Sequence, residues 1–172
     1  SVSRWVETSI PHDFRGDAMR PILGRLLLSV GSAANALRAQ KLRLRGAVLG
    51  RGVRISATVR IYNAKSLRIA DSVTINDFVH VWGGGGVTIG PSTMIAAHTV
   101  ISSQSHDTQA AAKGRLYKDT DVRFPVVIGT NVWIASNVTI GPGVTIGDNC
   151  IIGAGAVVLH DIPANSLAVG AP

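Results

Sequence analysis

The sequence of 172 residues predicts an all-β protein, a parallel β-helix of about five triangular coils. Aliphatic residues recur at every sixth position through the C-terminal part: Ile128, Ile134, Ile140, Ile146, Ile152 and Val158. A small or apolar residue follows four positions after each of the first five: Val132, Val138, Val144, Cys150 and Ala156. A period of six fits neither the helical turn nor strand alternation, and it is typical of hexapeptide β-helix repeats.

The same period extends towards the N-terminus with two irregular steps. The earlier inward positions are Leu49, Ile55, Ile61, Ile69, Ile75, Val81, Ile89, Ile95 and Ile101. The steps from Ile61 to Ile69 and from Val81 to Ile89 are eight residues long, so two residues are added at a corner in each place. Three hexads make one coil, and residues 49–172 are therefore predicted to be the β-helix domain.

The period stops after His106 and resumes at Ile128. We expect residues 107–127 to form a loop that leaves the coil, with His106 ending the last hexad at its mouth. Loops of this length without a repeat of their own are usually functional or disordered. This loop is the main interruption of the repeat.

Residues 1–48 are predicted to be a basic, partly helical extension. Between residues 21 and 44 apolar residues recur at spacings of three and four, and Pro21 suits a first helical turn. Eleven of the 17 basic residues, but only three of the ten acidic ones, fall within residues 1–60. Two roles stay open: a helix packed on the coil with solvated arginines, or attraction to an anionic membrane surface or a phosphate-bearing substrate.

Several classes of protein are excluded by composition. No apolar run reaches the length of a membrane span or resembles a signal peptide, and we expect a cytoplasmic protein. A single cysteine, Cys150 at a core position, excludes an intramolecular disulfide and fits a reducing compartment. Nucleic acid is not an expected partner, because no aromatic residues alternate with the basic ones.

Three segments carry a resemblance to a known family. Residues 101–107 read Ile-Ser-Ser-Gln-Ser-His-Asp, residues 131–134 read Asn-Val-Trp-Ile, and residues 161–163 read Asp-Ile-Pro. Together with the repeat, they resemble the hexapeptide acyltransferases, in particular galactoside and maltose O-acetyltransferases and their relatives in polysaccharide clusters. The resemblance covers residues 49–172.

This resemblance implies a left-handed β-helix that assembles as a homotrimer, with active sites between neighbouring subunits. It implies transfer of an acetyl group from acetyl-CoA to a hydroxyl of a sugar or polysaccharide precursor, free, nucleotide-linked or lipid-linked, without a metal. The loop 107–127 would then act as a lid over the acceptor. Its basic residues would meet a phosphorylated or nucleotide-linked sugar.

His106 is the candidate catalytic residue. A sugar hydroxyl is a poor nucleophile at neutral pH, so a base must take its proton as it attacks the thioester. Imidazole suits this role, and general-base catalysis typically contributes about 10²–10⁴-fold. His106 also matches the catalytic histidine of the resembled family. The group that orients its second ring nitrogen is not identified by the sequence.

Asn76 matches the acceptor-binding asparagine of the resembled family. The glycines at residues 83–86 depart from the galactoside enzymes, which have an acidic acceptor contact where Gly84 stands here. Galactoside specificity is therefore not carried over. We expect these glycines to form a wide corner that makes room for a bulkier acceptor.

The resembled family holds coenzyme A in a groove between coils, mainly through backbone groups. The matching positions are Trp133, Ala135, Ser136, Ala154, Leu159 and His160. Trp133 would lie on the outside of the prism, where a trimer contact is an alternative role. Leu159 and His160 replace the family's frequent Thr-Lys pair, which removes a positive charge near the nucleotide phosphates.

The remaining histidines and two other functions complete the sequence predictions. His80 and His98 are expected to be solvated or stacked between coils. A γ-class carbonic anhydrase would bind zinc through three histidines, but the spacings between His80, His98 and His106 do not resemble that family's pattern. A non-catalytic assembly module would not need the histidine, loop and Trp133 together.

Overall fold

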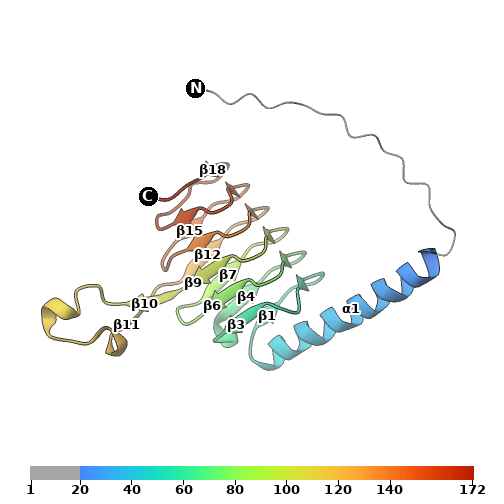
Figure 1. The fold of residues 1–172 in the computed structure, drawn as a ribbon, viewed down its shortest axis with the longest axis horizontal. Coiled ribbons are helices and arrows are strands. Elements are labelled where there is room, and N and C mark those ends of the chain that lie inside the picture. The colour runs from blue at the N-terminus through green and yellow to red at the C-terminus, as the bar shows by residue number, and fades with distance from the viewer. Residues whose placement is uncertain (1–19) are drawn as a thin grey trace, which may run out of the picture. The chain divides into compact units, whose positions relative to one another are not determined.

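The computed structural model describes the backbone of residues 20–172 and the side chains of residues 32–172. Helix α1 (Arg20–Leu44) is followed by short strands that wind into a left-handed parallel β-helix (Figure 1). The helix predicted for residues 21–44 is confirmed. The side chains of this helix before residue 32, and His12, lie outside the described residues.

The strands form three parallel sheets, one for each side of the coil (Figure 1). Sheet 1 contains β1 (Val48–Leu49), β4 (Leu67–Ile69), β7 (Val87–Ile89), β12 (Val126–Ile128) and β15 (Thr145–Ile146). Sheet 2 contains β2 (Arg54–Ile55), β5 (Thr74–Ile75), β8 (Met94–Ile95), β13 (Trp133–Ile134), β16 (Ile151–Ile152) and β18 (Leu167–Ala168). Sheet 3 contains β3 (Arg60–Tyr62), β6 (His80–Trp82), β9 (Val100–Ser102), β14 (Thr139–Ile140) and β17 (Val157–Val158).

The interior is built as the six-residue period predicts. Every inward aliphatic position named from the sequence is at most 9% exposed, and Cys150 is 1% exposed. Equivalent residues stack in register, as in the succession Ile75, Ile95, Ile134 and Ile152 on sheet 2. Each coil buries its side chains against its neighbours, so stacking supplies the core. About five coils were predicted; five are complete, and the bridge from Ile146 to Ile162 and β18 begin a sixth.

The two eight-residue steps lie at corners, as predicted, and both corners join sheet 3 to sheet 1. In the first, Asn63 adopts a left-handed conformation and a short 3₁₀ helix η1 (Ala64–Ser66) follows. In the second, the glycines of residues 83–86 connect β6 to β7, and Gly86 has a φ of 98°. Residues other than glycine rarely adopt this φ, because their Cβ would clash with the backbone.

The interruption of the repeat is a hairpin at the same kind of corner. Strands β10 (Gln104–His106) and β11 (Asp121–Arg123) pair antiparallel, and the tip contains η2 (Ala111–Lys113) and η3 (Tyr117–Asp119). The chain leaves the coil directly after Ser103, which is fully buried and donates from Oγ to the Trp82 carbonyl at 2.8 Å. His106 therefore lies in the hairpin stem. The prediction that it ends a hexad of the coil is wrong, because Ser103 already fills the corner.

The C-terminal half of α1 covers the first coil. The Asn35 side-chain amide donates to the Val53 carbonyl at 2.9 Å and accepts from the Ile55 N–H at 2.8 Å, as a neighbouring strand would. Arg38, Arg43 and Arg45 donate to further carbonyls of this coil. Backbone groups that would otherwise lie at an open edge are thus bonded.

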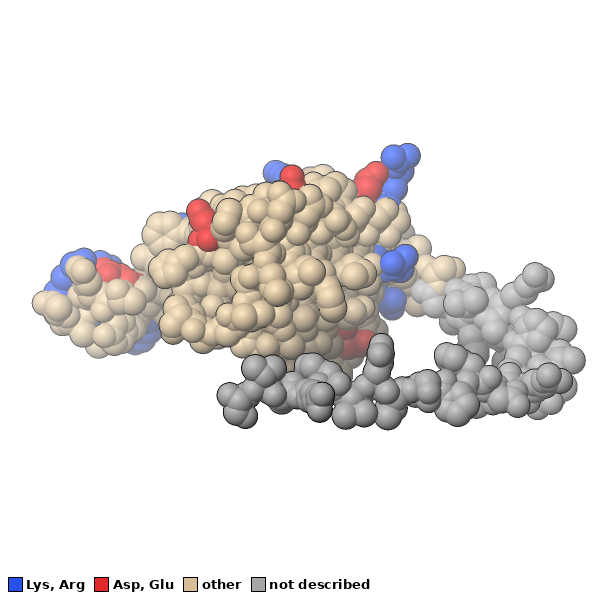
Figure 2. Space-filling model, turned by 90° about the horizontal axis from the view of Figure 1, so that it is seen from above, with Lys and Arg blue, Asp and Glu red and all other residues tan. Residues whose placement is uncertain are grey.

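Figure 2 shows Lys and Arg near the hairpin tip and towards the α1 end, with a broad surface between them that carries only a few charged groups. Over residues 20–172, no helix has the length and apolar character needed to cross a bilayer.

Candidate active site

The hairpin stem places a carboxylate beside the candidate catalytic histidine. His106 and Asp121 are direct partners in the antiparallel pair, so their side chains share one face. His106 Nδ1 lies 3.5 Å from Asp121 Oδ1, and both side chains are about half exposed. Asp121 Oδ2 lies 3.7 Å from Arg123 Nη2. This arrangement turns Nδ1 towards the carboxylate and leaves Nε2 for substrate, and such contacts tighten when substrate binds.

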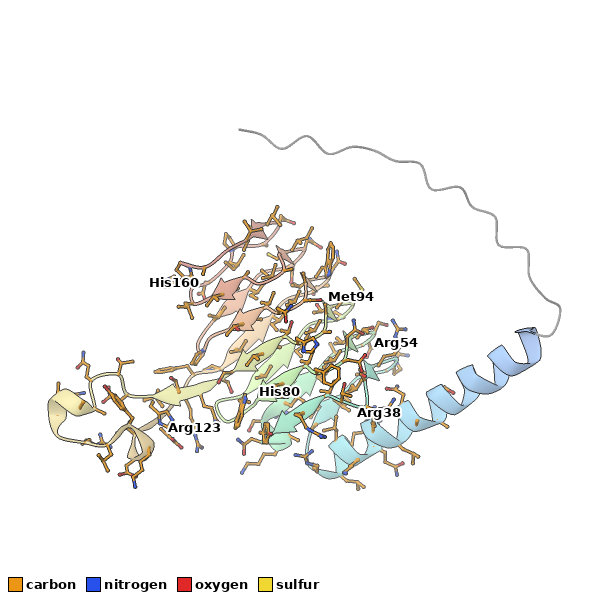
Figure 3. All side chains as sticks on the ribbon, viewed as in Figure 1. Arg38, Arg54, His80, Met94, Arg123 and His160 are labelled. Carbon is orange, nitrogen blue, oxygen red and sulfur yellow. The ribbon has the colours of Figure 1, made fainter. Side chains whose placement is uncertain are left out.

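His106 and Asp121 line an open groove of about 360 Å³ where the hairpin leaves sheet 3. The other lining residues are Trp82, Val100, Ser102, Gln104 and Ser105. Ser102 Oγ donates to the Gln104 carbonyl at 2.7 Å, which fixes the start of β10. Figure 3 shows Arg123 at the hairpin stem and His80 on β6 of sheet 3.

Trp82 supplies an aromatic wall to this groove. Its ring stacks on Tyr62 at 4.1 Å between centroids and 14° between planes. Trp82 is 37% exposed and Tyr62 is 42% exposed, so one edge of the stack faces solvent. Aromatic rings in binding sites give a rigid apolar surface, which suits the C–H face of a pyranose.

Gly84 and Gly85 serve the hairpin. A Cβ at Gly84 would collide with the side-chain oxygen of Gln104, and one at Gly85 would collide with the Ser103 carbonyl oxygen and approach Phe124. The expectation that these glycines leave space for a bulkier acceptor is therefore wrong, because the hairpin stem occupies that space.

Asn76 lies at a different corner of the coil from this groove. It is exposed at the corner from sheet 2 to sheet 3, whereas the hairpin leaves at the corner from sheet 3 to sheet 1. Asn76, Ala96 and Ala135 occupy equivalent positions in successive coils, joined by backbone bonds between neighbouring coils. Asn76 therefore shares an edge with Ala135, and one chain does not bring it to His106.

The carboxylate beside Asn76 fixes that corner. Ser56 Oγ and Thr58 Oγ1 donate to Asp77, and these hydrogen bonds hold the pKa of the Asp77 carboxyl below its ordinary value. The Phe78 N–H donates to Thr58 Oγ1 at 2.8 Å. The backbone that presents Asn76 is thereby tied to the preceding coil.

The candidate coenzyme A residues divide between two corners and one face. Ala135, Ser136 and Ala154 lie at the corner from sheet 2 to sheet 3. Trp133 projects from the outer face of sheet 2, where it is 49% exposed and in register with Met94 and Ile151. These three exposed side chains form an apolar stripe across neighbouring strands.

Leu159 and His160 lie at the other corner, which also carries the hairpin. Both are exposed, and they line a hollow of about 210 Å³ with the residues that end the chain. Figure 3 shows His160 on the side of the coil from which the hairpin emerges, and Met94 on the opposite side.

The other histidines have structural contacts. His98 adopts a left-handed φ of 62°, and its ring stacks on Phe78 at 4.9 Å, so the predicted stacking between coils is confirmed. His80 projects from β6 between Arg60 and Val100 in the sheet register. In the part of the chain that the structure describes, no three His, Cys, Asp or Glu side chains gather as metal ligands.

The base of the hairpin loop is held by a second carboxylate, Asp107. The Gln109 N–H and Lys113 Nζ donate to it at 2.9 and 3.1 Å, and these bonds lower the pKa of Asp107 from its ordinary 3.8. Because the pKa of Asp107 is lowered, its ionised carboxylate stabilises the folded loop at pH values above 3.8. This stabilisation is lost as the pH falls through the lowered pKa.

Sequence reasoning missed Asp121 and Trp82. Asp121 could be found only once the hairpin register was known, because the loop carries no periodic signal. Trp82 had one available signal: it occupies the same coil position as Tyr62, and two aromatic residues recur there on an outward face.

Asp121→Asn should lower kcat of a reaction that uses His106 as base by roughly ten- to hundredfold, since a hydrogen bond to a charged partner, formed as the 3.5 Å contact tightens, contributes about 1.5–3 kcal/mol. The variant keeps the shape of the side chain, so KM for the substrates and the unfolding midpoint should stay unchanged. Asp121→Glu should restore part of kcat. Asp119→Asn, in the same loop, is the matched control; an equal loss in both variants would contradict a positioning role for Asp121.

Comparison with known proteins gives consistent relatives. Residues 125–160 match the family model for the bacterial transferase hexapeptide (six repeats). The chain is 36% identical over 135 residues to a putative colanic acid biosynthesis acetyltransferase of Escherichia coli (strain K12), covering 78% of this chain and 71% of the relative. It is 36% identical over 88 residues to galactoside O-acetyltransferase of the same strain, but spans 41% of that protein's length.

Solved structures agree with these relatives. A hexapeptide-repeat acetyltransferase from Vibrio cholerae superposes with a TM-score of 0.75 at 31% identity, covering 90% of this chain and 87% of the other. A structure of that protein with acetyl coenzyme A gives a TM-score of 0.74. A galactoside acetyltransferase in complex with coenzyme A gives 0.71 at 34% identity, covering 77% of this chain and 65% of the other.

Proposed function

The chain belongs to the hexapeptide-repeat acetyltransferases, and on this premise we propose that it transfers the acetyl group of acetyl-CoA to a hydroxyl of a sugar. The observation that carries the proposal is the pair of His106 and Asp121 in a groove walled by Trp82. The pair can take a proton, and the groove can receive a pyranose. Relatives named as sugar acetyltransferases, one of them solved with coenzyme A, support this reaction.

In the proposed mechanism, His106 Nε2 accepts the proton of the acceptor hydroxyl as its oxygen attacks the thioester carbonyl carbon. A C–O bond forms, and the carbonyl oxygen of the tetrahedral intermediate carries the negative charge. When the C–S bond breaks, the imidazolium returns the proton to the sulfur of coenzyme A. Asp121 keeps Nδ1 oriented and stabilises the imidazolium between the two steps.

We propose that the complete site forms between chains of a homotrimer. Asn76 and the corner residues Ala135, Ser136 and Ala154 lie on one edge of the coil, and His106 lies at another. A threefold arrangement can set one edge against the hairpin of a neighbouring chain. The exposed stripe of Met94, Trp133 and Ile151 offers apolar surface for this contact or for the pantetheine arm. Sedimentation equilibrium should then give the mass of three chains.

The donor would lie along these edges, with Trp133, Leu159 and His160 as further candidate contacts. Leu159 and His160 lie on the same edge as the hairpin and are open to solvent. Acetyl-CoA as donor and a single reduced cysteine support the cytoplasm as the place of reaction.

The proposal is tested by following thiol release from acetyl-CoA in the presence of a panel of galactosides, maltose, glucosides and glycosyl phosphates. We expect release that depends on the acceptor, with a product heavier by one acetyl group in the mass spectrum. Isothermal titration should show acetyl-CoA binding without an acceptor. Absence of both binding and acceptor-dependent release would refute the assignment.

A further inference from the structure

A second groove lies at the β3 end of sheet 3, between α1 and the first coil. It has a volume of about 210 Å³, and its rim carries the basic side chains Arg38, Lys41, Arg45 and Arg60. Its floor is apolar, formed by Leu42, Ile55, Val59 and Ile61, all of them buried or partly buried. No residue with a proposed catalytic or coenzyme A role lines it.

The described part of the chain places few carboxylates near this groove. No acidic residue occurs between residues 18 and 70. Asp71 pairs with Arg51 at 3.1 Å, and Asp77 accepts hydrogen bonds from Ser56 and Thr58. Among the described residues, no carboxylate forms an ion pair with a rim residue. Four cations around one hollow repel each other, and an anionic ligand would relieve that repulsion.

Two of the rim arginines are held in place. Arg38 Nε donates to the Ile55 carbonyl and Arg45 Nη2 donates to the Ile61 carbonyl, both at 2.8 Å. Each guanidinium keeps further N–H groups, and little side-chain entropy is left to lose when a ligand binds. Figure 3 shows Arg38 beside the lower end of the coil. Preorganised guanidinium groups are suited to the oxygens of phosphate.

An aromatic bridge connects this groove to the candidate active site. Tyr62 lines the basic groove and stacks on Trp82, which lines the groove of His106. In the sheet register Tyr62, Trp82 and Ser102 are successive partners, so this path crosses two strand spacings, about 10 Å. That distance suits a short saccharide with a charged group at one end.

We propose that the acceptor is a glycosyl phosphate or diphosphate whose phosphate binds in the basic groove. Its sugar lies across Tyr62 and Trp82, and its hydroxyl reaches His106. This assignment of a substrate class rests on the proposed acetyl transfer. The apolar floor accommodates whatever the phosphate carries on its other side, a nucleoside or a lipid.

The binding test uses inorganic pyrophosphate as probe and the double variant Lys41→Gln/Arg60→Gln. The charged groups of Lys41 and Arg60 have no partner among the described residues, so their removal should leave the fold unchanged. We expect pyrophosphate to bind the wild-type protein in isothermal titration and the double variant at least about tenfold more weakly. Arg68→Gln, a change at another exposed arginine, on sheet 1, should have little effect. Equal binding by all three proteins, or no binding, would overturn the site.

The activity test compares glucose and galactose with their 1-phosphates. We expect a lower KM for the phosphates in the wild-type protein, and loss of this difference in the double variant. Acetyl transfer to neutral sugars with no preference for phosphates would overturn the substrate class and leave the acetyltransferase assignment standing. Pyrophosphate binding without any thiol release would instead refute the reaction and leave the anion site standing.

Vesicles distinguish the two sources of phosphate. Co-sedimentation with phosphatidylcholine vesicles containing phosphatidylglycerol, lost in the double variant, would support a lipid-linked acceptor. Pyrophosphate binding without vesicle binding would support a soluble, nucleotide-linked acceptor.

Discussion

His106→Ala lowers the turnover of acetyl transfer by about 10²–10⁴-fold, the usual contribution of a general base. Without the imidazole, the acceptor hydroxyl must attack while still carrying its proton, and nothing returns a proton to the departing thiolate. The expected signature is a loss in kcat at nearly constant affinity for acetyl-CoA. Steady-state thiol release together with titration of acetyl-CoA measures both quantities.

The loss of turnover in His106→Ala should not arise from unfolding. The His106 side chain is about half exposed and belongs to the hairpin rather than to the packed interior. The unfolding midpoint and the sedimentation mass should therefore match those of the wild-type protein. His80→Ala is the matched control, because His80 projects from β6 of sheet 3, two residues before Trp82, but does not line the groove. Turnover that survives in His106→Ala would exclude His106 as the base.

Gly85→Ala is expected to damage both stability and activity. The added methyl group would collide with the Ser103 carbonyl and approach the Phe124 nitrogen to 2.8 Å, so both ends of the hairpin stem must shift. Overpacking of this kind typically costs about 1–3 kcal/mol in the free energy of unfolding. A displacement of about 1 Å at His106 and Asp121 can cost about 100-fold in rate. Chemical denaturation and thiol release are the two measurements.

Gly114→Ala provides the comparison. Gly114 lies in the same loop with a φ of 64°, and an added Cβ would meet nothing within 4 Å. This change strains the loop tip without moving the stem, so turnover should be retained. If Gly85→Ala kept wild-type turnover, the hairpin would not be what positions the catalytic pair.

The interior of the fold could be predicted closely because it is repetitive. One side chain in six enters a narrow interior that is shared with the coils above and below. Each coil therefore needs Ile or Val at the same positions. The eight-residue steps were equally visible, since a shift of two residues disturbs every following position. The helix over residues 21–44 followed from its apolar spacing.

The site was predicted only in part, because it lies where the repeat is absent. His106 could be identified from its place in a recognisable motif. Its partner Asp121 depends on an antiparallel register that the six-residue period does not predict. The glycines of residues 83–86 were misread for a similar reason. Gly84 and Gly85 must be small because the stem of the hairpin, which comes later in the sequence, packs against them. The basic charge was visible, but the groove that collects it exists only once α1 lies against the first coil.

The amide of Asn35 has a consequence for association between molecules. A stack of parallel strands can in principle grow without limit, because its last strand offers the next chain the same row of donors and acceptors. Asn35 and the neighbouring arginines occupy that row at β2 with side-chain groups. A second chain could add a strand to this end of the coil only by displacing these side-chain hydrogen bonds.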